Sequence, residues 1–273
     1  MIFVPPDLEG EQKYAEKVRS TMQDQHSADA WFFYRRAMPQ ARLRLFCFPY
    51  GGGGAAIFRN WSELMTPDIE VCPVQLMGRE SRLHDQPTTN MTQLMETMAP
   101  ALLPYIDRPF AFFGHCMGAL ISFEFARYLR HHYKLVPAHL FVSGLRAPHL
   151  AHSEPPVHHL PDVEFLEMIR HLKGTPEEVL SNAEMLQVLL PTLRADFTLS
   201  ETYVYRYDEP LRCPIAAYAG AQDAKTSRED LEAWQKQTTQ RLTLRFFAGD
   251  HFFLNTASRV HLVQDIIKEL HRR

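Results

Sequence analysis

Short runs of hydrophobic residues recur along the chain, and glycine or proline and a helix-like stretch follow them. The runs contain β-branched and aromatic residues, which favour strands, and their alternation with helices predicts a largely parallel sheet covered on both faces. Six runs are predicted as strands: residues 44–49, 70–75, 109–114, 138–143, 214–220 and 242–247. The pattern therefore predicts the α/β fold class.

The pattern changes between the fourth and fifth predicted strands. Roughly residues 149–209 contain no clear strand and three helix-like segments, which begin at Pro161, Pro176 and Pro191. Proline is favoured in a first helical turn, because the N–H groups there have no acceptor within the helix and the absence of one costs nothing. We therefore predict a helical lid over the carboxyl edge of the sheet, which is where ligands bind in open α/β sheets.

Residues 1–30 are polar with helical potential, and we predict that they are an appendage to one domain of residues 31–273. The segment lacks the regions of a signal peptide, and no apolar run approaches the roughly 18 residues that a membrane span needs. The four cysteines include no C-x-x-C pair, so we expect reduced thiols at Cys47, Cys72 and Cys213. These features predict a cytoplasmic protein that does not bind a membrane.

Composition and charge exclude one broad class of function. The formal net charge is −3, so the chain has no basic surplus for general nucleic-acid binding. Of the 14 histidines, four lie close together at His149, His152, His158 and His159. Their spacing matches no compact set of metal ligands, and a solvated loop is the preferred interpretation. We therefore expect no metal site.

The third predicted strand runs into Gly-His-Cys-Met-Gly at residues 114–118, and an amphipathic helix is predicted from Ala119 to about Arg130. This is the G-x-S-x-G nucleophile elbow with Cys116 in the place of serine. A β-carbon at either glycine would collide with backbone in so tight a turn, and the helix N-terminus favours a thiolate. Although so short a pattern also arises by chance, its strand–helix context favours Cys116 as nucleophile and the Met117 N–H as an oxyanion donor.

Four consecutive glycines at residues 51–54 follow the first predicted strand. In the α/β-hydrolase fold the loop at this place supplies a second oxyanion N–H group, and glycines let backbone approach a substrate closely. A phosphate-binding loop would place lysine and Ser/Thr after the glycines, and both are missing. Gly51 is the predicted donor, with Gly52 as the alternative.

Two further residues complete a predicted catalytic triad. His251 follows the last predicted strand and can act as general base, while Asp223 follows the preceding strand and can orient the imidazole. The order nucleophile, acid, histidine is that of the α/β-hydrolase fold. Asp250 and Asp196 are alternative acids; the first is adjacent to the histidine and so would point elsewhere, and the second lies in the lid.

Over about residues 30–270 the chain resembles the type II thioesterases of non-ribosomal peptide and polyketide pathways. The resemblance rests on FCFPYGGG (46–53), Phe58 with Trp61, QLMGRE (75–80), GHCMGA (114–119), LRADF (193–197) and GDHFF (249–253). It places the family's catalytic acid at Asp223 and its histidine at His251. It implies an enzyme that removes wrong or stalled acyl groups from the phosphopantetheine of acyl or peptidyl carrier proteins. It also implies a lid that shapes the acyl pocket, and no cofactor bound by the protein itself.

The chain departs from the family pattern at several places. The family usually has serine where Cys116 stands and proline where Met77 stands, and its loop is less rich in glycine than residues 51–54. Similar proteins with cysteine at the elbow transfer acyl or aminoacyl groups between carrier proteins. Hydrolysis, transfer between carriers and non-catalytic carrier binding therefore remain three hypotheses, of which hydrolysis by a monomer is preferred.

The residues that contact the acyl group are less well defined by sequence. Apolar lid residues suggest a hydrophobic lining, although apolar helix faces more often pack than bind. The candidates for substrate binding are Tyr50, Gly52, Phe165, Phe197 and Phe252.

Overall fold

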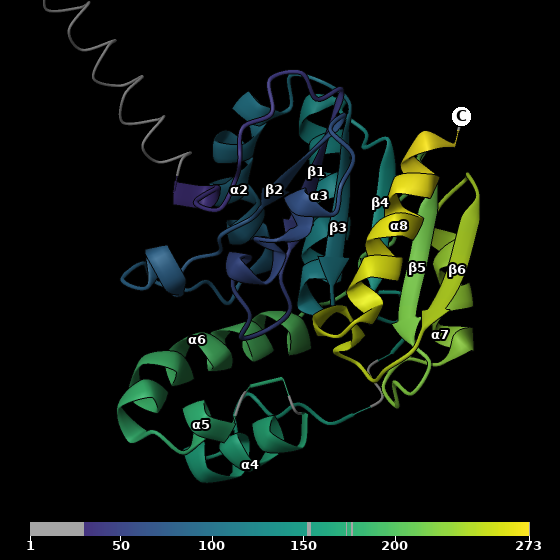
Figure 1. Ribbon diagram of the computed structural model, residues 1–273. Helices are drawn as coiled ribbons and strands as arrows, with labels where there is room; N and C mark the ends of the chain where they lie inside the picture. The colour runs from purple at the N-terminus through teal and green to yellow at the C-terminus, as the bar shows by residue number, and fades with distance from the viewer. Residues whose placement is uncertain (1–29, 152–153, 173, 176, 273) are drawn as a thin grey trace, which may run out of the picture.

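In the described part of the chain, six parallel strands form one sheet in the order β2-β1-β3-β4-β5-β6 (Figure 1). This computed structural model describes residues 30–151, 154–172, 174–175 and 177–272. The strands are β1 (Leu43–Phe48), β2 (Ile69–Pro73), β3 (Phe110–His115), β4 (His139–Ser143), β5 (Ile215–Gly220) and β6 (Leu242–Phe247). All six predicted strands are confirmed, with small shifts at their ends.

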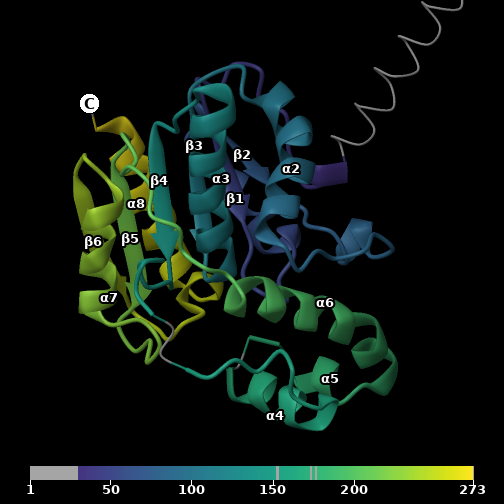
Figure 2. The ribbon, with the colours of Figure 1, turned by 180° about the vertical axis from the view of Figure 1, so that it is seen from behind.

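Helices cover both faces of the sheet because alternate side chains of a strand point to opposite sides. The helices in the described residues are α2 (Met91–Leu102), α3 (Met117–Tyr133), α4 (Asp162–Leu172), α5 (Glu177–Leu180), α6 (Ala183–Glu201), α7 (Arg228–Glu232) and α8 (Ser258–His271). In β1, Phe46 and Phe48 join a core with α2, α3 and α7, whereas Leu45 and Cys47 join a second core with α8. Figure 1 shows α8 in front of the sheet, and the reverse view in Figure 2 brings α3 and α2 forward.

The predicted helical insertion lies at the carboxyl ends of the strands and is made of α4, α5 and α6 (Figure 1). Four of its buried residues, Phe165, Ile169, Leu180 and Leu193, form a small core of their own, whereas Leu199 of α6 joins the core on the α2 and α3 face. The lid is therefore a layer with its own core that is joined to the domain through α6.

One predicted helix start is wrong. Pro191 lies inside α6, which begins at Ala183, where the side chain of Asn182 accepts a hydrogen bond from the Met185 N–H. A proline removes one backbone hydrogen bond from a helix interior, and this helix continues through it. Pro161 directly precedes α4, in agreement with prediction, and Pro176 lies outside the described residues.

The ends of the predicted domain are partly described. Trp31 and Phe32 are buried in the core on the α2 and α3 face, so the packed domain includes residue 31. All but the last residue of the predicted appendage 1–30 lies outside the described residues. Among the helices that the structure describes, none combines the length and apolar character of a membrane span.

Candidate active site

Cys116 lies in the tight turn between β3 and α3 and has φ 53° and ψ −119°. A positive φ is strained for a residue with a β-carbon, and such strain is concentrated at functional sites. A Cβ added at Gly114 would lie 2.1 Å from the carbonyl oxygen of Gly118, and one added at Gly118 would lie 2.1 Å from that of Phe48. Both glycines are therefore sterically required, and the turn presents the thiol at the N-terminus of α3.

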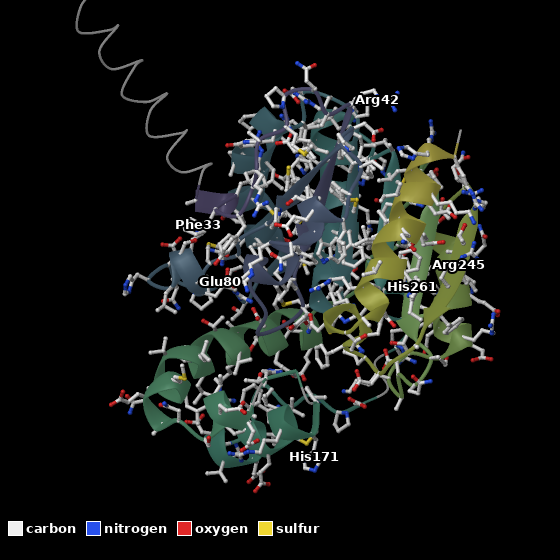
Figure 3. The ribbon with its side chains drawn as sticks, in the orientation of Figure 1. Phe33, Arg42, Glu80, His171, Arg245 and His261 are labelled. Carbon is white, nitrogen blue, oxygen red and sulfur yellow. The ribbon has the colours of Figure 1, made fainter. Side chains whose placement is uncertain are left out.

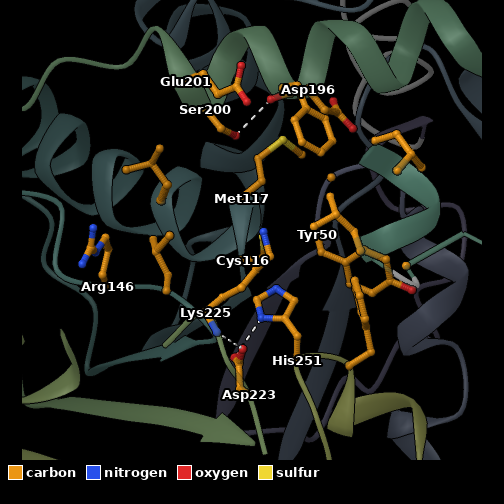
Figure 4. Close-up of a pocket in the computed structure, with 18 of the residues that line it drawn as sticks. Tyr50, Cys116, Met117, Arg146, Asp196, Ser200, Glu201, Asp223, Lys225 and His251 are labelled. Carbon is orange, nitrogen blue, oxygen red and sulfur yellow. Dashed lines mark hydrogen bonds and ion pairs between the residues drawn. The ribbon is translucent and has the colours of Figure 1, made fainter. Parts of the chain in front are cut away.

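His251 lies between the other two residues predicted to act with it, Cys116 and Asp223 (Figure 4). Its Nδ1 lies 2.8 Å from Oδ2 of Asp223, and its ring also forms a hydrogen bond with the Cys116 thiol. The Asp223 side chain is 1% exposed, and its Oδ1 accepts a hydrogen bond from the Lys225 N–H at 2.9 Å. Thiol, imidazole and carboxylate therefore form one connected chain.

The two alternative acids lie elsewhere. The Oδ1 of Asp250 accepts the N–H of Phe252, two residues along the chain, and Asp250 is solvent-exposed. Asp196 forms a buried ion pair with Arg79 at 2.6 Å. Asp223 is thus the aspartate of the three that the structure places against His251.

The charges of the site favour a thiolate–imidazolium pair. Burial alone would raise the pKa of Cys116, but the hydrogen bond and charge of His251, the Met117 N–H and the charge of Lys225 lower it overall. Burial alone would lower the pKa of His251, but its bonds to Asp223 and Cys116 and their negative charges raise it to about 10. The thiolate is the nucleophilic form of cysteine, so the site holds Cys116 ready to attack.

The pKa values of the other three cysteines are shifted in the opposite direction to that of Cys116. Burial raises the pKa of Cys47, and it raises the pKa of both Cys72 and Cys213 to about 12.

We therefore expect iodoacetamide near pH 7 to alkylate Cys116 before the other three cysteines. Because the pKa of Cys116 is lowered, its alkylation rate should stay high as the pH falls below the usual cysteine pKa of about 8.5 and decline only at lower pH. Peptide mass mapping of the alkylated protein across a pH series measures this; equal labelling of all four thiols would contradict it.

A cavity of 460 Å³ opens beside Cys116 and reaches under the lid (Figure 4). Of the predicted substrate-binding residues, Tyr50, Phe197 and Phe252 line it, as does Gly51. Apolar side chains come from α3, the loop after β4, and the lid: Leu120, Leu145, Ala147, Leu150, Ile169, Leu172 and Leu193. The cavity therefore offers an apolar chamber next to the thiol.

Two predicted substrate-binding residues do not line this cavity. Phe165 is fully buried in the lid's own core, with its ring centroid 5.4 Å from that of Phe197. The N–H of Gly52 donates to Oδ2 of Asp196 at 2.7 Å, and Leu193 packs against the same glycine. Most polar lining residues that sequence reasoning missed come from loops and from the end of α6: Arg146, Ser200, Glu201, Tyr203, Gln222 and Lys225. His171, which Figure 3 shows on the lid, lines the cavity from α4.

Three described histidines outside the triad, His115, His149 and His158, have polar partners of their own. His115 is fully buried, its Nδ1 lies 2.8 Å from Oγ of Ser143, and burial holds its pKa well below the usual range. His149 bonds to Gln237, and His158 bonds to Glu201; His152 lies outside the described residues. Among the residues that are described, no group of three or more His, Cys, Asp and Glu side chains could hold a metal ion.

A parallel sheet with a nucleophile elbow after β3, an aspartate after β5 and a histidine after β6 defines an α/β-hydrolase. The chain belongs to the thioesterase domain family, whose profile matches residues 43–271.

Relatives of known name are similar over most of their length. The gramicidin S biosynthesis protein GrsT of Aneurinibacillus migulanus is 46% identical over 240 residues, covering 88% of this chain and 93% of GrsT. The thioesterase RedJ of the prodiginine pathway of Streptomyces coelicolor is 40% identical, covering 88% of this chain and 98% of RedJ, with a TM-score of 0.79. The type II thioesterase BorB of the borrelidin cluster is 34% identical, covering 87% and 96%, also with a TM-score of 0.79. The prediction of a thioester hydrolase is confirmed at the level of the family.

Proposed function

We propose that this protein hydrolyses acyl or aminoacyl thioesters on the phosphopantetheine of carrier proteins through a covalent intermediate on Cys116. The observation that carries the proposal is the chain of hydrogen bonds from Cys116 through His251 to Asp223 beside an apolar, lid-covered cavity. The relatives support the pathway, because GrsT and RedJ belong to the synthesis of peptide and prodiginine metabolites and BorB is a type II thioesterase. Its partners are acyl or peptidyl carrier proteins in secondary-metabolite synthesis.

Acylation begins when the Cys116 thiolate attacks the thioester carbonyl. The tetrahedral intermediate carries its negative charge on oxygen, where the N–H groups of Met117 and Gly51 donate hydrogen bonds; each such donor contributes roughly 3–4 kcal/mol to lowering the barrier. As the intermediate collapses, the bond to the pantetheine sulfur breaks and the His251 imidazolium protonates that sulfur. The product is an acyl thioester of Cys116 and a free carrier thiol.

Deacylation reverses the roles with water as the nucleophile. Neutral His251 takes a proton from a water molecule as the water oxygen attacks the acyl carbon, and the same N–H groups hold the second oxyanion. The bond between carbon and the Cys116 sulfur then breaks, which releases the carboxylic acid and restores the thiolate–imidazolium pair. Asp223 keeps His251 in one orientation and stabilises its positive charge in both halves of the cycle.

The sulfur nucleophile also favours a second candidate, transfer of the acyl group to another carrier. Exchange of a pantetheine thioester for a cysteine thioester changes the free energy little, so the step is readily reversed by a second pantetheine thiol. A serine would form a more stable oxyester and make the return step harder. The acyl-enzyme is common to both functions, and only the second nucleophile differs.

A two-carrier experiment separates these functions. The enzyme is incubated with a radiolabelled acyl carrier and an equal amount of an empty, pantetheinylated second carrier, and free acid and the labelled second carrier are measured over time. We expect free acid to form faster, as hydrolysis requires. Label that reaches the second carrier faster would establish a transferase. If intact-protein mass spectrometry detects no acyl adduct on Cys116 during the reaction, non-catalytic carrier binding becomes the better explanation.

A further inference from the structure

A buried ion pair attaches the lid to the segment after β2, next to the glycine-rich loop. Asp196, on α6, binds Arg79 through both carboxylate oxygens, at 2.6 and 2.8 Å. The two side chains are 4% and 5% exposed. Such a paired geometry is the most directional that arginine and a carboxylate can form. The contact therefore fixes the lid helix to the domain at one defined place.

Both members of this pair also bind the loop backbone. The Gly52 N–H donates to Oδ2 of Asp196 at 2.7 Å, and Nη1 of Arg79 donates to the carbonyl oxygen of Gly53 at 2.9 Å. Leu193, one helical turn earlier on α6, lies so close that a Cβ added at Gly52 would be 2.5 Å from its Cδ2. The lid thus contacts the loop through the carboxylate of Asp196 and the side chain of Leu193, while Arg79 contacts the loop from the domain side.

The loop needs an external restraint because of its own conformation. The Gly53 N–H closes a turn on the carbonyl oxygen of Tyr50 at 2.9 Å, and Gly52, the third residue of that turn, has φ +77°. A positive φ at this position is typical of a type II turn. Glycine on both sides of the central peptide permits other rotations at little steric cost. The bond from Gly52 to Asp196 selects one orientation of the peptide that joins Gly51 to Gly52.

We propose that Asp196, together with Arg79, is a positioning residue for the oxyanion hole. By holding the Gly51–Gly52 peptide, the lid helix restricts the backbone conformation of Gly51, which lines the cavity beside Cys116, and so keeps the Gly51 N–H in place for the reacting carbonyl. The docked lid is therefore part of what makes the site competent. This inference rests on the proposed function, since it assigns the Gly51 N–H to the oxyanion of a thioester. If the Asp196–Arg79 ion pair only stabilised the fold, its loss would slow all reactions of the Cys116 thiol alike and would not slow attack on a carbonyl in particular.

Two reactions of the same sulfur test this distinction. Acylation by an acyl-pantetheine thioester develops an oxyanion, whereas alkylation by iodoacetamide displaces iodide at a saturated carbon and develops none. For Asp196→Asn we expect the acylation rate at saturating thioester to fall at least about tenfold, and by no more than the roughly 10²- to 10³-fold that loss of a whole oxyanion donor costs. We expect the alkylation rate to stay within about twofold of wild type, because the thiolate–imidazolium pair is untouched. Stopped acylation followed by intact-protein mass measurement gives the first rate, and labelling kinetics give the second.

A matched control is available on the same helix. Thr192 is buried and donates its hydroxyl to the carbonyl oxygen of Gly78 at 2.6 Å, so it joins α6 to the segment that contains Arg79 and not to the glycine-rich loop. Thr192→Val should leave the ratio of the acylation and alkylation rates unchanged. Arg79→Lys keeps the charge but loses the paired geometry, and we expect the ratio of its acylation rate to its alkylation rate to fall by about threefold or more. If Asp196→Asn does not fold, this second variant tests the positioning role instead.

The outcomes are distinct. Equal losses of both rates, or no loss of acylation, would overturn the positioning role while leaving the proposed function intact. Failure of the wild-type protein to be acylated by any pantetheine thioester, with alkylation normal, would overturn the proposed function and this inference with it.

Discussion

Replacing Cys116 with alanine is expected to lower turnover of an acyl-carrier thioester by about four orders of magnitude or more, because it removes the atom that forms the proposed covalent intermediate. No other thiol can substitute. The remaining cysteines are buried, and burial raises their pKa values. The measurement is release of free acid from a radiolabelled acyl carrier by purified wild-type and variant protein.

The control for this variant is Cys213→Ala. Cys213 is buried on the α2 and α3 face and does not line the cavity, so its loss should leave the rate near that of wild type. Cys116→Ala should in addition retain the fold, which circular dichroism checks. Turnover of the Cys116→Ala variant near the wild-type rate would refute the assigned nucleophile.

Replacing His251 with alanine is expected to lower the same rate by about three orders of magnitude, within the range for loss of a general acid–base group. Two effects combine. The thiol loses the charge and the hydrogen bond that lower its pKa, and the departing pantetheine sulfur loses its proton donor. The iodoacetamide reaction of Cys116 at pH 7 should slow in this variant, since less thiolate is present.

A pair of matched aspartate variants tests the rest of the triad. Asp223→Asn removes the charge 2.8 Å from His251, whereas Asp250→Asn changes an exposed aspartate next to it in sequence. The first should reduce turnover much more than the second. The opposite ranking would transfer the role of acid to Asp250, and a fully active His251→Ala variant would remove the imidazole from the mechanism.

The parts of the fold that repeat a strong local pattern were predictable from sequence. Buried strands such as Phe110–His115 read as continuous apolar runs, and the two glycines around Cys116 mark a turn that no larger residue fits. The start of α6 was mispredicted because Pro191 is an unusual interior proline, while the signal that operates is the cap at Asn182.

The contacts made between distant segments were not predictable in the same way. Phe165 and Phe197 lie on lid helices with similar apolar patterns, yet the first is fully buried in the lid core and the second also lines the cavity. Asp196 pairs with Arg79, which is 117 residues away in sequence, and no local pattern in the sequence indicates that the two side chains meet. Periodicity identifies which residues are buried, but the neighbour that a buried residue meets depends on how the elements are arranged in three dimensions.

The two halves of the lid are held differently, and this has a consequence for how such enzymes diversify. The carboxyl-terminal half of α6 is bonded to the domain through Thr192 and Asp196, whereas Ile169 and Leu172 reach the cavity from α4, which packs within the lid core. Substitutions on α4 can therefore alter the length or bulk of the accepted chain without disturbing the chemistry. We therefore expect related enzymes that act on different substrates to differ more on α4 than on the carboxyl-terminal half of α6.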